Sequence, residues 1–170
     1  MSTIVHKFEE AGLGKAPFRL VGNYTKIYQA CHGAPIQPGA CCDYCGTGIM
    51  DVYLIRSADG KEFEVGSDCV KKTGDEGLVD TVKRAANKLK AERRHEREKA
   101  KIKVIRENWA NDPDTRAKLA ELPHPNSYFA GKGKTLADYV DWLLDRGGNA
   151  GMLSVPRIIA RATAPKEHSV

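Results

Sequence analysis

A group of cysteines near the start of the chain constrains the fold most strongly. Two residues separate Cys42 from Cys45, Gly46 follows directly, and twenty-three residues separate Cys45 from Cys69. Two thiolates at the first spacing chelate one ion when the chain turns tightly between them, and glycine supplies the dihedral angle that this turn needs. Together with Cys31 as a fourth ligand, this pattern predicts one structural Zn²⁺ ion.

The residues between this cysteine knuckle and Cys69 predict a β-hairpin followed by a helix. On either side of a turn at 58–60, the side chains alternate as in two short antiparallel strands, with one set Val52, Leu54, Phe63 and Val65 and the other Tyr53, Ile55, Glu62 and Glu64. Residues 66–68 (Gly-Ser-Asp) are of the types that cap the N-terminus of a helix. Cys69 is therefore expected in the first turn of a helix, where the positive end of the helix dipole favours a thiolate.

Knuckle, hairpin and a helix with a ligand in its first turn resemble the treble-clef group of zinc folds, over residues 40–74. In that group the helix end brings two ligands three residues apart, and Gly66 stands here in the place of one of them. The fourth ligand is therefore expected from elsewhere. A strand ahead of the knuckle favours Cys31, with Cys41 and His32 as alternatives. Cys41 is the weaker candidate, because neighbouring side chains in an extended segment point in opposite directions.

Three phrases of the sequence, FEEAGLGKAPF, CDYCGTGI and DGKEFEVGSDCVKK, are similar to those of small zinc-knuckle proteins that phages and prophages encode. The resemblance covers roughly the first 75 residues. It implies a phage protein and supplies no catalytic residues.

The cellular compartment is predicted from the cysteines and from the N-terminus. Five cysteines leave one unpaired in any set of disulfides, and the N-terminus has no apolar secretory core. No run of the sequence approaches the roughly 18 apolar residues of a membrane span. These features predict a cytoplasmic protein with free thiols and no membrane contact.

Helix caps divide the chain and predict an α+β protein. Asp75, Asp112 and Thr135 each precede a helical pattern. The predicted parts are a zinc-stabilised β-rich N-terminal module (1–74), a long basic helix (75–110), a small helical C-terminal part (111–162) and a disordered tail (163–170).

The positive charge of the chain is concentrated between Lys83 and Lys103, where ten basic residues face three acidic ones. A run of charge is often only a solvated face. This excess of one sign, directly after a zinc module, favours contact with the phosphates of DNA or RNA without base readout. The predicted contact residues are Lys83, Arg84, Lys88, Lys90, Arg93, Arg94, Arg97, Lys99, Lys101 and Lys103.

The sequence therefore predicts a non-enzymatic, zinc-containing nucleic-acid-binding protein. The alternative is an interaction protein that binds a host factor through its helical C-terminal surface and the exposed part of the long helix. A nuclease fits less well, because residues 49–74 contain no histidine to activate water and a closed four-ligand site leaves no position for substrate. A phosphate-binding loop at residues 131–135 is excluded by Tyr128, which stands where that motif requires glycine.

Overall fold

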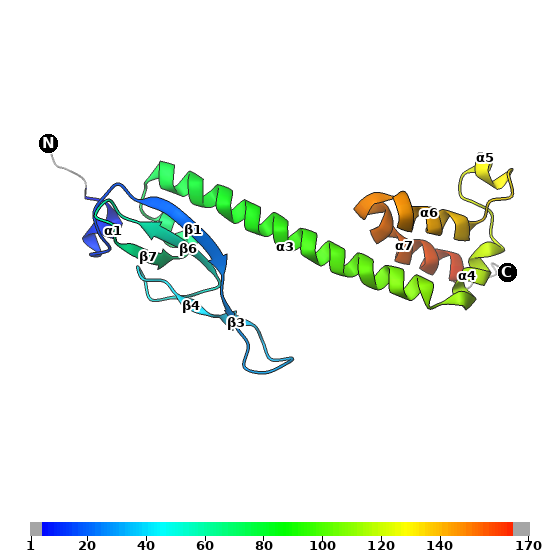
Figure 1. Cartoon of the computed structure of the whole chain (residues 1–170), viewed down its shortest axis with the longest axis horizontal. Coiled ribbons are helices and arrows are strands. Elements are labelled where there is room, and N and C mark those ends of the chain that lie inside the picture. Colours follow the sequence, from blue (N-terminus) through cyan, green and yellow to red (C-terminus); the bar gives the residue numbers. More distant parts are fainter. Residues whose placement is uncertain (1–4, 165–170) are drawn as a thin grey trace, which may run out of the picture. The chain divides into compact units, whose positions relative to one another are not determined.

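A computed structural model describes residues 5–164 and divides the chain into two compact units, unit 1 (Met1–Ala91) and unit 2 (Glu92–Val170). The division falls inside α3 (Glu76–Ala110), a continuous helix of 35 residues, drawn in green in Figure 1. The long helix predicted over residues 75–110 is therefore present, and its two ends belong to different units. The whole is a mixed α+β protein with a small antiparallel sheet.

Unit 1 is built on a three-stranded antiparallel sheet in which β6 lies between β1 and β7. Its strands are β1 (Arg19–Thr25), β6 (Asp51–Arg56) and β7 (Glu62–Val65). The predicted hairpin is confirmed, but its faces differ from the predicted pattern: Tyr53 pairs with Val65 and Ile55 with Phe63, so Tyr53 and Ile55, not Val52 and Leu54, share a face with the apolar residues of β7. These four paired side chains are buried, because α1 (Lys7–Glu10) and the start of α3 complete the core over this sheet.

Shorter elements surround the sheet. Two short antiparallel ladders are present, each with two residues per strand. One joins β2 to β3, and the other joins β4 to β5. The predicted helix around Cys69 is present as a short helix directly after β7. These elements are α1 (Lys7–Glu10), β2 (Ile27–Tyr28), β3 (Gln37–Pro38), β4 (Ala40–Cys41), β5 (Gly48–Ile49) and α2 (Ser67–Lys71).

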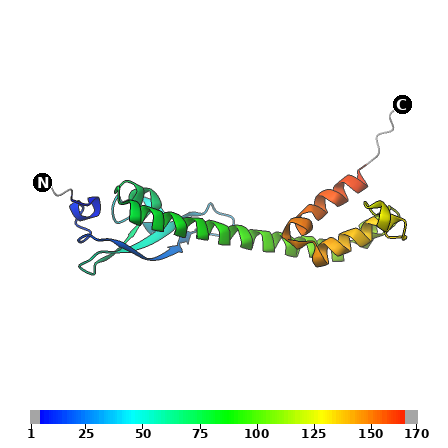
Figure 2. The same ribbon diagram turned by 90° about the horizontal axis from the view of Figure 1, so that it is seen from above.

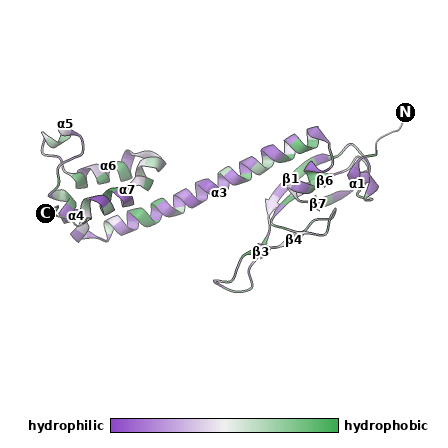
Figure 3. Ribbon diagram, turned by 180° about the vertical axis from the view of Figure 1, so that it is seen from behind, coloured by the Kyte–Doolittle hydropathy of each residue, from purple (hydrophilic) through white to green (hydrophobic). Residues whose placement is uncertain are grey.

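Aromatic side chains form the centre of the unit 1 core. The ring of Phe8 lies 5.6 Å from that of Phe18 and 5.2 Å from that of Phe63, in edge-to-face contacts that aromatic pairs prefer. Leu78 and Val82 of α3 are buried against this cluster. Farther along α3 the apolar spacing ends, which leaves the middle of the helix hydrophilic, as Figure 3 shows.

Unit 2 has a core formed by α4, α6 and α7 around Trp109 near the end of α3, while the short helix α5 has no buried residue. Asp112 accepts a hydrogen bond from the backbone N–H of Thr115 at 3.0 Å, and Thr135 forms a reciprocal capping box with Asp138, so both predicted helix starts are confirmed. The helices α6 and α7 are in contact, and Figure 2 shows them meeting at one end and diverging toward the other. The helices are α4 (Pro113–Ala120), α5 (Ser127–Ala130), α6 (Leu136–Arg146) and α7 (Gly148–Thr163).

The last helix is longer than the sequence pattern indicated. The sequence offers one apolar run after residue 148, at 155–160, yet α7 covers sixteen residues and includes Pro156. Val155 is fully buried against Trp109 and Val140, so tertiary packing holds the helix despite the proline. The predicted tail starts at Thr163, which is the last residue of α7, and residues 165–170 lie outside the described part.

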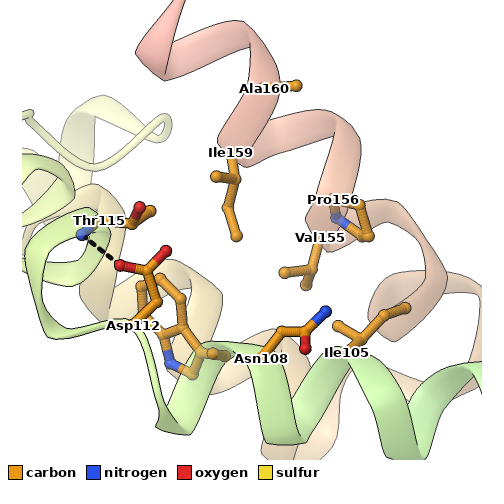
Figure 4. A pocket seen from close by; sticks show the side chains of 9 residues that line it. Ile105, Asn108, Asp112, Thr115, Val155, Pro156, Ile159 and Ala160 are labelled. Carbon is orange, nitrogen blue, oxygen red and sulfur yellow. Dashed lines mark hydrogen bonds between the residues drawn. The ribbon is translucent and has the colours of Figure 1, made fainter.

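A pocket of about 270 Å³ opens in unit 2 beside the last turns of α3, and Figure 4 shows its lining. Most of the lining is apolar, from Ile105, Val155 and Ile159 among others. Its carboxylate, Asp112, is engaged in the cap of α4 that the dashed line marks. The pocket is therefore a gap between packed helices, and the Asp112 carboxylate in its lining already accepts a hydrogen bond.

None of the described helices is both long and apolar enough to cross a membrane.

Candidate metal centre and basic surface

Three thiols converge in unit 1 at the position that the cysteine spacing predicts. The sulfur atoms of Cys42, Cys45 and Cys69 all lie within 4.8 Å of one another, and those of Cys45 and Cys69 are 3.3 Å apart. All five cysteines of the chain are free thiols. The three sulfur atoms are therefore close enough to coordinate a single metal ion.

Backbone hydrogen bonds build the knuckle that carries two of these thiols. The N–H of Gly46 donates to the carbonyl of Cys42 at 2.8 Å, and the N–H of Cys42 donates to the carbonyl of Thr47 at 2.9 Å. Gly46 has a φ of 71°, which a residue with a Cβ adopts only under strain. The predicted turn is thus present, and it brings Cys42 and Cys45 to the same side.

The third thiol reaches the knuckle because β7 runs directly into α2. The backbone N–H of Asp43 donates to the carbonyl of Glu64 at 2.8 Å, and the N–H of Glu64 donates to the Asp43 carboxylate at 2.6 Å. These two bonds tie the end of the hairpin to the knuckle. Cys69, in the first turn of α2, then lies beside Cys45.

The surroundings of the thiols shift their ionisation in opposite directions. A hydrogen bond with the Thr47 hydroxyl, 3.4 Å away, lowers the pKa of Cys45 to about 6. Burial raises the pKa of Cys69 to about 12. A buried thiol of this kind is neutral by itself, and a bound cation reverses that preference by stabilising the thiolate.

The distances fit a thiolate-bound ion. Zinc lies about 2.3 Å from a thiolate sulfur, which separates two sulfurs of a tetrahedral site by about 3.8 Å. The three observed sulfurs span a comparable range, up to 4.8 Å. Thiolate ligands favour soft or borderline metals over magnesium and calcium. The donor set of Cys42, Cys45 and Cys69 therefore suits a metal such as zinc.

The structure does not bring the predicted fourth ligand to this group. Cys31 and its alternative His32 are exposed in the loop between β2 and β3. Cys41 is also exposed, and its sulfur lies 3.1 Å from the carbonyl oxygen of Gly46. Among residues 5–164, none of these three side chains joins the thiol group. The assignment of Cys31 as a ligand stays a prediction, since it requires the β2–β3 loop to reach the thiols.

Two matched serine variants decide the fourth ligand. We expect Cys31→Ser to bind less metal than the unchanged protein, because Cys31 is the predicted fourth ligand, and Cys41→Ser to bind as much, because Cys41 is an exposed thiol outside the three-thiol group. Metal content per folded chain is the measurement. A loss confined to Cys31→Ser would establish Cys31 as the fourth ligand, and a loss confined to Cys41→Ser would assign Cys41 instead.

The predicted nucleic-acid contacts all lie on α3. Nine of the ten side chains are exposed, and Arg93 is half-buried and has an interaction partner. Some form ion pairs along the helix, such as Lys99 with Glu96 at 3.1 Å and Arg94 with Glu98 at 3.8 Å. Exposed pairs of this kind are weak. The basic groups are therefore accessible to a solvent-side partner.

Five of these residues share one face of α3. Lys83, Lys90, Arg94, Arg97 and Lys101 follow one another at spacings of seven, four, three and four residues. At 3.6 residues per turn, they fall within about 60° of one another and extend over about 27 Å of helix. We call these five residues the basic stripe. Net charge alone did not reveal it, although the heptad-like spacing is visible in the sequence.

The acidic residues of the same segment lie mostly away from the basic stripe. At the same helical period, Glu92 and Glu96 fall on the opposite side of α3, and Glu98 borders the stripe. The opposite side also carries Lys88, Lys99 and Lys103, so it mixes both signs of charge, whereas the basic stripe carries cations alone. The uniform sign of the stripe distinguishes that one face from an evenly mixed solvated helix.

Comparison with models of protein families, with curated proteins and with solved structures finds no match to this chain. Functional inference therefore depends on the geometry of the metal centre and of α3.

Proposed function

We propose that this chain is a non-enzymatic nucleic-acid-binding protein in which a zinc ion holds unit 1 together and α3 contacts phosphates. The basic stripe is the observation that carries the proposal, since five exposed cationic side chains on one helical face form a row. A row of cations about 27 Å long matches the regular array of charge along a nucleic-acid backbone. Such contacts position the protein and read no sequence.

The metal centre supports a structural role for zinc. The ion would join the knuckle to α2 through Cys42, Cys45 and Cys69, in an arrangement that resembles a treble clef. Among the described residues, no histidine or carboxylate joins these thiols. A metal-bound water would therefore lack an adjacent general base, which favours a structural over a catalytic site.

Reversal of charge on the basic stripe tests the proposal. The triple variant Lys90→Glu, Arg94→Glu, Arg97→Glu changes exposed groups, so the fold is expected to remain, as circular dichroism can check. Each lost phosphate contact removes a released counterion, so the slope of log affinity against log salt should become shallower by about 0.9 per contact on duplex DNA. Binding titrations over a salt series give both affinity and slope.

A matched control has the same change in net charge on the other side of α3. Lys88, Lys99 and Lys103 lie opposite the stripe at the helical period and are also exposed. We expect Lys88→Glu, Lys99→Glu, Lys103→Glu to weaken binding less than the stripe variant. Equal losses would contradict a contact through the stripe. If the unchanged protein binds neither DNA nor RNA even at about 50 mM salt, the proposed function is wrong.

A further inference from the structure

Five aromatic rings form a continuous row in unit 2. Ring centroids are 5.3 Å apart for Tyr128 and Phe129, 5.1 Å for Phe129 and His124, 5.1 Å for His124 and Tyr139, and 6.2 Å for Tyr139 and Trp142. The row joins α5, the loop before it and α6. We call these five residues the aromatic row.

The two ends of the aromatic row are open to solvent. The exposed fractions are 62% for Tyr128, 44% for Phe129 and 53% for Trp142, although large aromatic residues usually bury most of their surface. Trp142 stacks on Tyr139 with an angle of 11° between the rings. One face of the indole is thus supported, while more than half of its surface remains accessible.

The segment that carries the row is held in place by hydrogen bonds. Asn126 accepts from the N–H of Tyr128 at 2.9 Å, and His124 Nδ1 accepts from the N–H of Asn126 at 3.0 Å. Backbone bonds at 3.1 Å link Lys134 to Phe129 and His124 to Lys134. The exposed rings are therefore ordered before any ligand arrives, which reduces the entropic cost of binding.

The charge around the exposed rings is positive or neutralised. Residues 122–137 contain no acidic side chain, and Lys132 Nζ lies 4.4 Å from the centre of the Tyr128 ring. The carboxylates of α6 are engaged: Asp138 pairs with Lys134 at 3.4 Å, Asp141 with Arg116 at 2.6 Å, and Asp145 with Arg146 at 3.1 Å. A ligand with aromatic faces and negative charge fits this surface.

We infer that the aromatic row is a stacking platform for the unpaired bases of single-stranded nucleic acid. This inference rests on the proposed function and adds to it a ligand class, single strands, and a second contact. Trp142 and Tyr128 offer the most accessible rings on which bases can stack, and the exposed Lys132 lies beside Tyr128, where it can contact a phosphate. Stacking accepts every base, so little sequence preference is expected.

Intrinsic fluorescence tests the platform in the full-length protein. The chain has two tryptophans, of which Trp109 is 6% exposed and Trp142 is 53% exposed. Titration with a short oligothymidylate should quench the emission of Trp142, because a stacked base contacts its indole. The Trp142→Phe variant should lose this quenching, and a DNA duplex of equal length should produce little of it.

Affinity measurements on matched variants give a second readout. Loss of one stacked base should weaken single-strand binding by about 5- to 150-fold in Trp142→Ala and in Tyr128→Ala. Tyr28→Ala removes a tyrosine of similar exposure, 57%, from β2 in unit 1 and should leave the affinity unchanged. Because these rings carry no charge, the salt slope should stay the same.

The two proposals fail in different ways. If Trp142→Ala and Tyr128→Ala bind single strands normally while the stripe variant is weakened, the platform is wrong and the proposed function stands. If the stripe variant binds normally and only the ring variants are weakened, the phosphate contact through α3 is wrong. If single strands do not bind but a protein partner does, and Trp142→Ala abolishes that contact, the aromatic row is a protein interface and the inference is overturned.

Discussion

Removal of the metal should unfold unit 1 and leave unit 2 folded. Structural zinc contributes about 10–16 kcal/mol to the folding of zinc-finger peptides, which is comparable to the whole stability of a typical domain, about 5–15 kcal/mol. In unit 1 an ion held by the three thiols would join the knuckle to α2. Without the ion, the small sheet and its aromatic core are expected to be insufficient.

Two signals report on the two units separately in this experiment. After treatment with a chelator, the backbone amides of β6 should lose their protection from hydrogen exchange, because β6 is the central strand of the unit 1 sheet. Both tryptophans, Trp109 and Trp142, belong to unit 2. Tryptophan emission should therefore stay unchanged while β6 exchanges.

Substitution of a ligand should reproduce the effect of the chelator. Cys45 is exposed, so Cys45→Ser removes little packing and its effect reports the loss of the metal. Cys41→Ser is the matched control, because Cys41 is an exposed thiol outside the three-thiol group. Full protection of β6 in metal-free Cys45→Ser would show that the thiols do not supply the folding energy of unit 1.

The parts of the fold that depend on short-range signals could be predicted from the sequence. The Gly46 turn, the hairpin up to Val65, and the helix starts at Asp112 and Thr135 are all present. Each is determined by a cap or a turn within a few residues. The same reason explains the correct prediction that Cys42, Cys45 and Cys69 come together, because only the hairpin separates the knuckle from α2.

The position of Cys31 could not be predicted in this way. The distance of Cys31 from the thiols depends on where the β2–β3 loop lies. The position of that loop follows from the pairing of the two-residue strands β2 and β3 with each other. The sequence suggested a strand that would place Cys31 beside the knuckle. Long-range placement of a loop leaves no local pattern in the sequence, so the fourth ligand stayed open.

The extent of α7 was missed because its glycines and its proline indicate a break. Gly151 instead allows close packing, since a Cβ at this position would lie 3.1 Å from the Leu143 side chain. Pro156 lies inside the helix next to Val155, which is fully buried. Packing against α6 therefore outweighs the local preference, as it often does for helices inside a core.

The aromatic row was missed for a different reason. Its rings come from separate segments, at residues 124–129 and 139–142, and the bridge between Pro123 and Thr135, with the backbone bonds beside it, brings these segments together. One signal was available. Tyr139 and Trp142 are three residues apart in a helix, which places their side chains next to each other.

Trp109→Ala should destabilise unit 2 strongly and leave the metal centre intact. Trp109 is 6% exposed at the end of α3, and its indole N–H donates to Asp141 at 2.8 Å. Truncation of a buried tryptophan costs about 3–5 kcal/mol, because it leaves a cavity and here also an acceptor without its donor. That loss is a large part of the stability of a domain.

The affected unit distinguishes this variant from the loss of metal. Metal content and the protection of β6 should stay unchanged, while the midpoint of denaturant unfolding for unit 2, followed by the emission of Trp142, should move to a lower concentration. Val104→Ala is the control, because Val104 lies on the same helix and is 53% exposed. A shift as small as that of Val104→Ala would contradict the central place of Trp109 in the core of unit 2. Simultaneous loss of metal from Trp109→Ala would show that the two units depend on each other for folding. Retention of metal would show that the end of α3 in unit 2 can lose its packing while the start of α3 stays packed in unit 1.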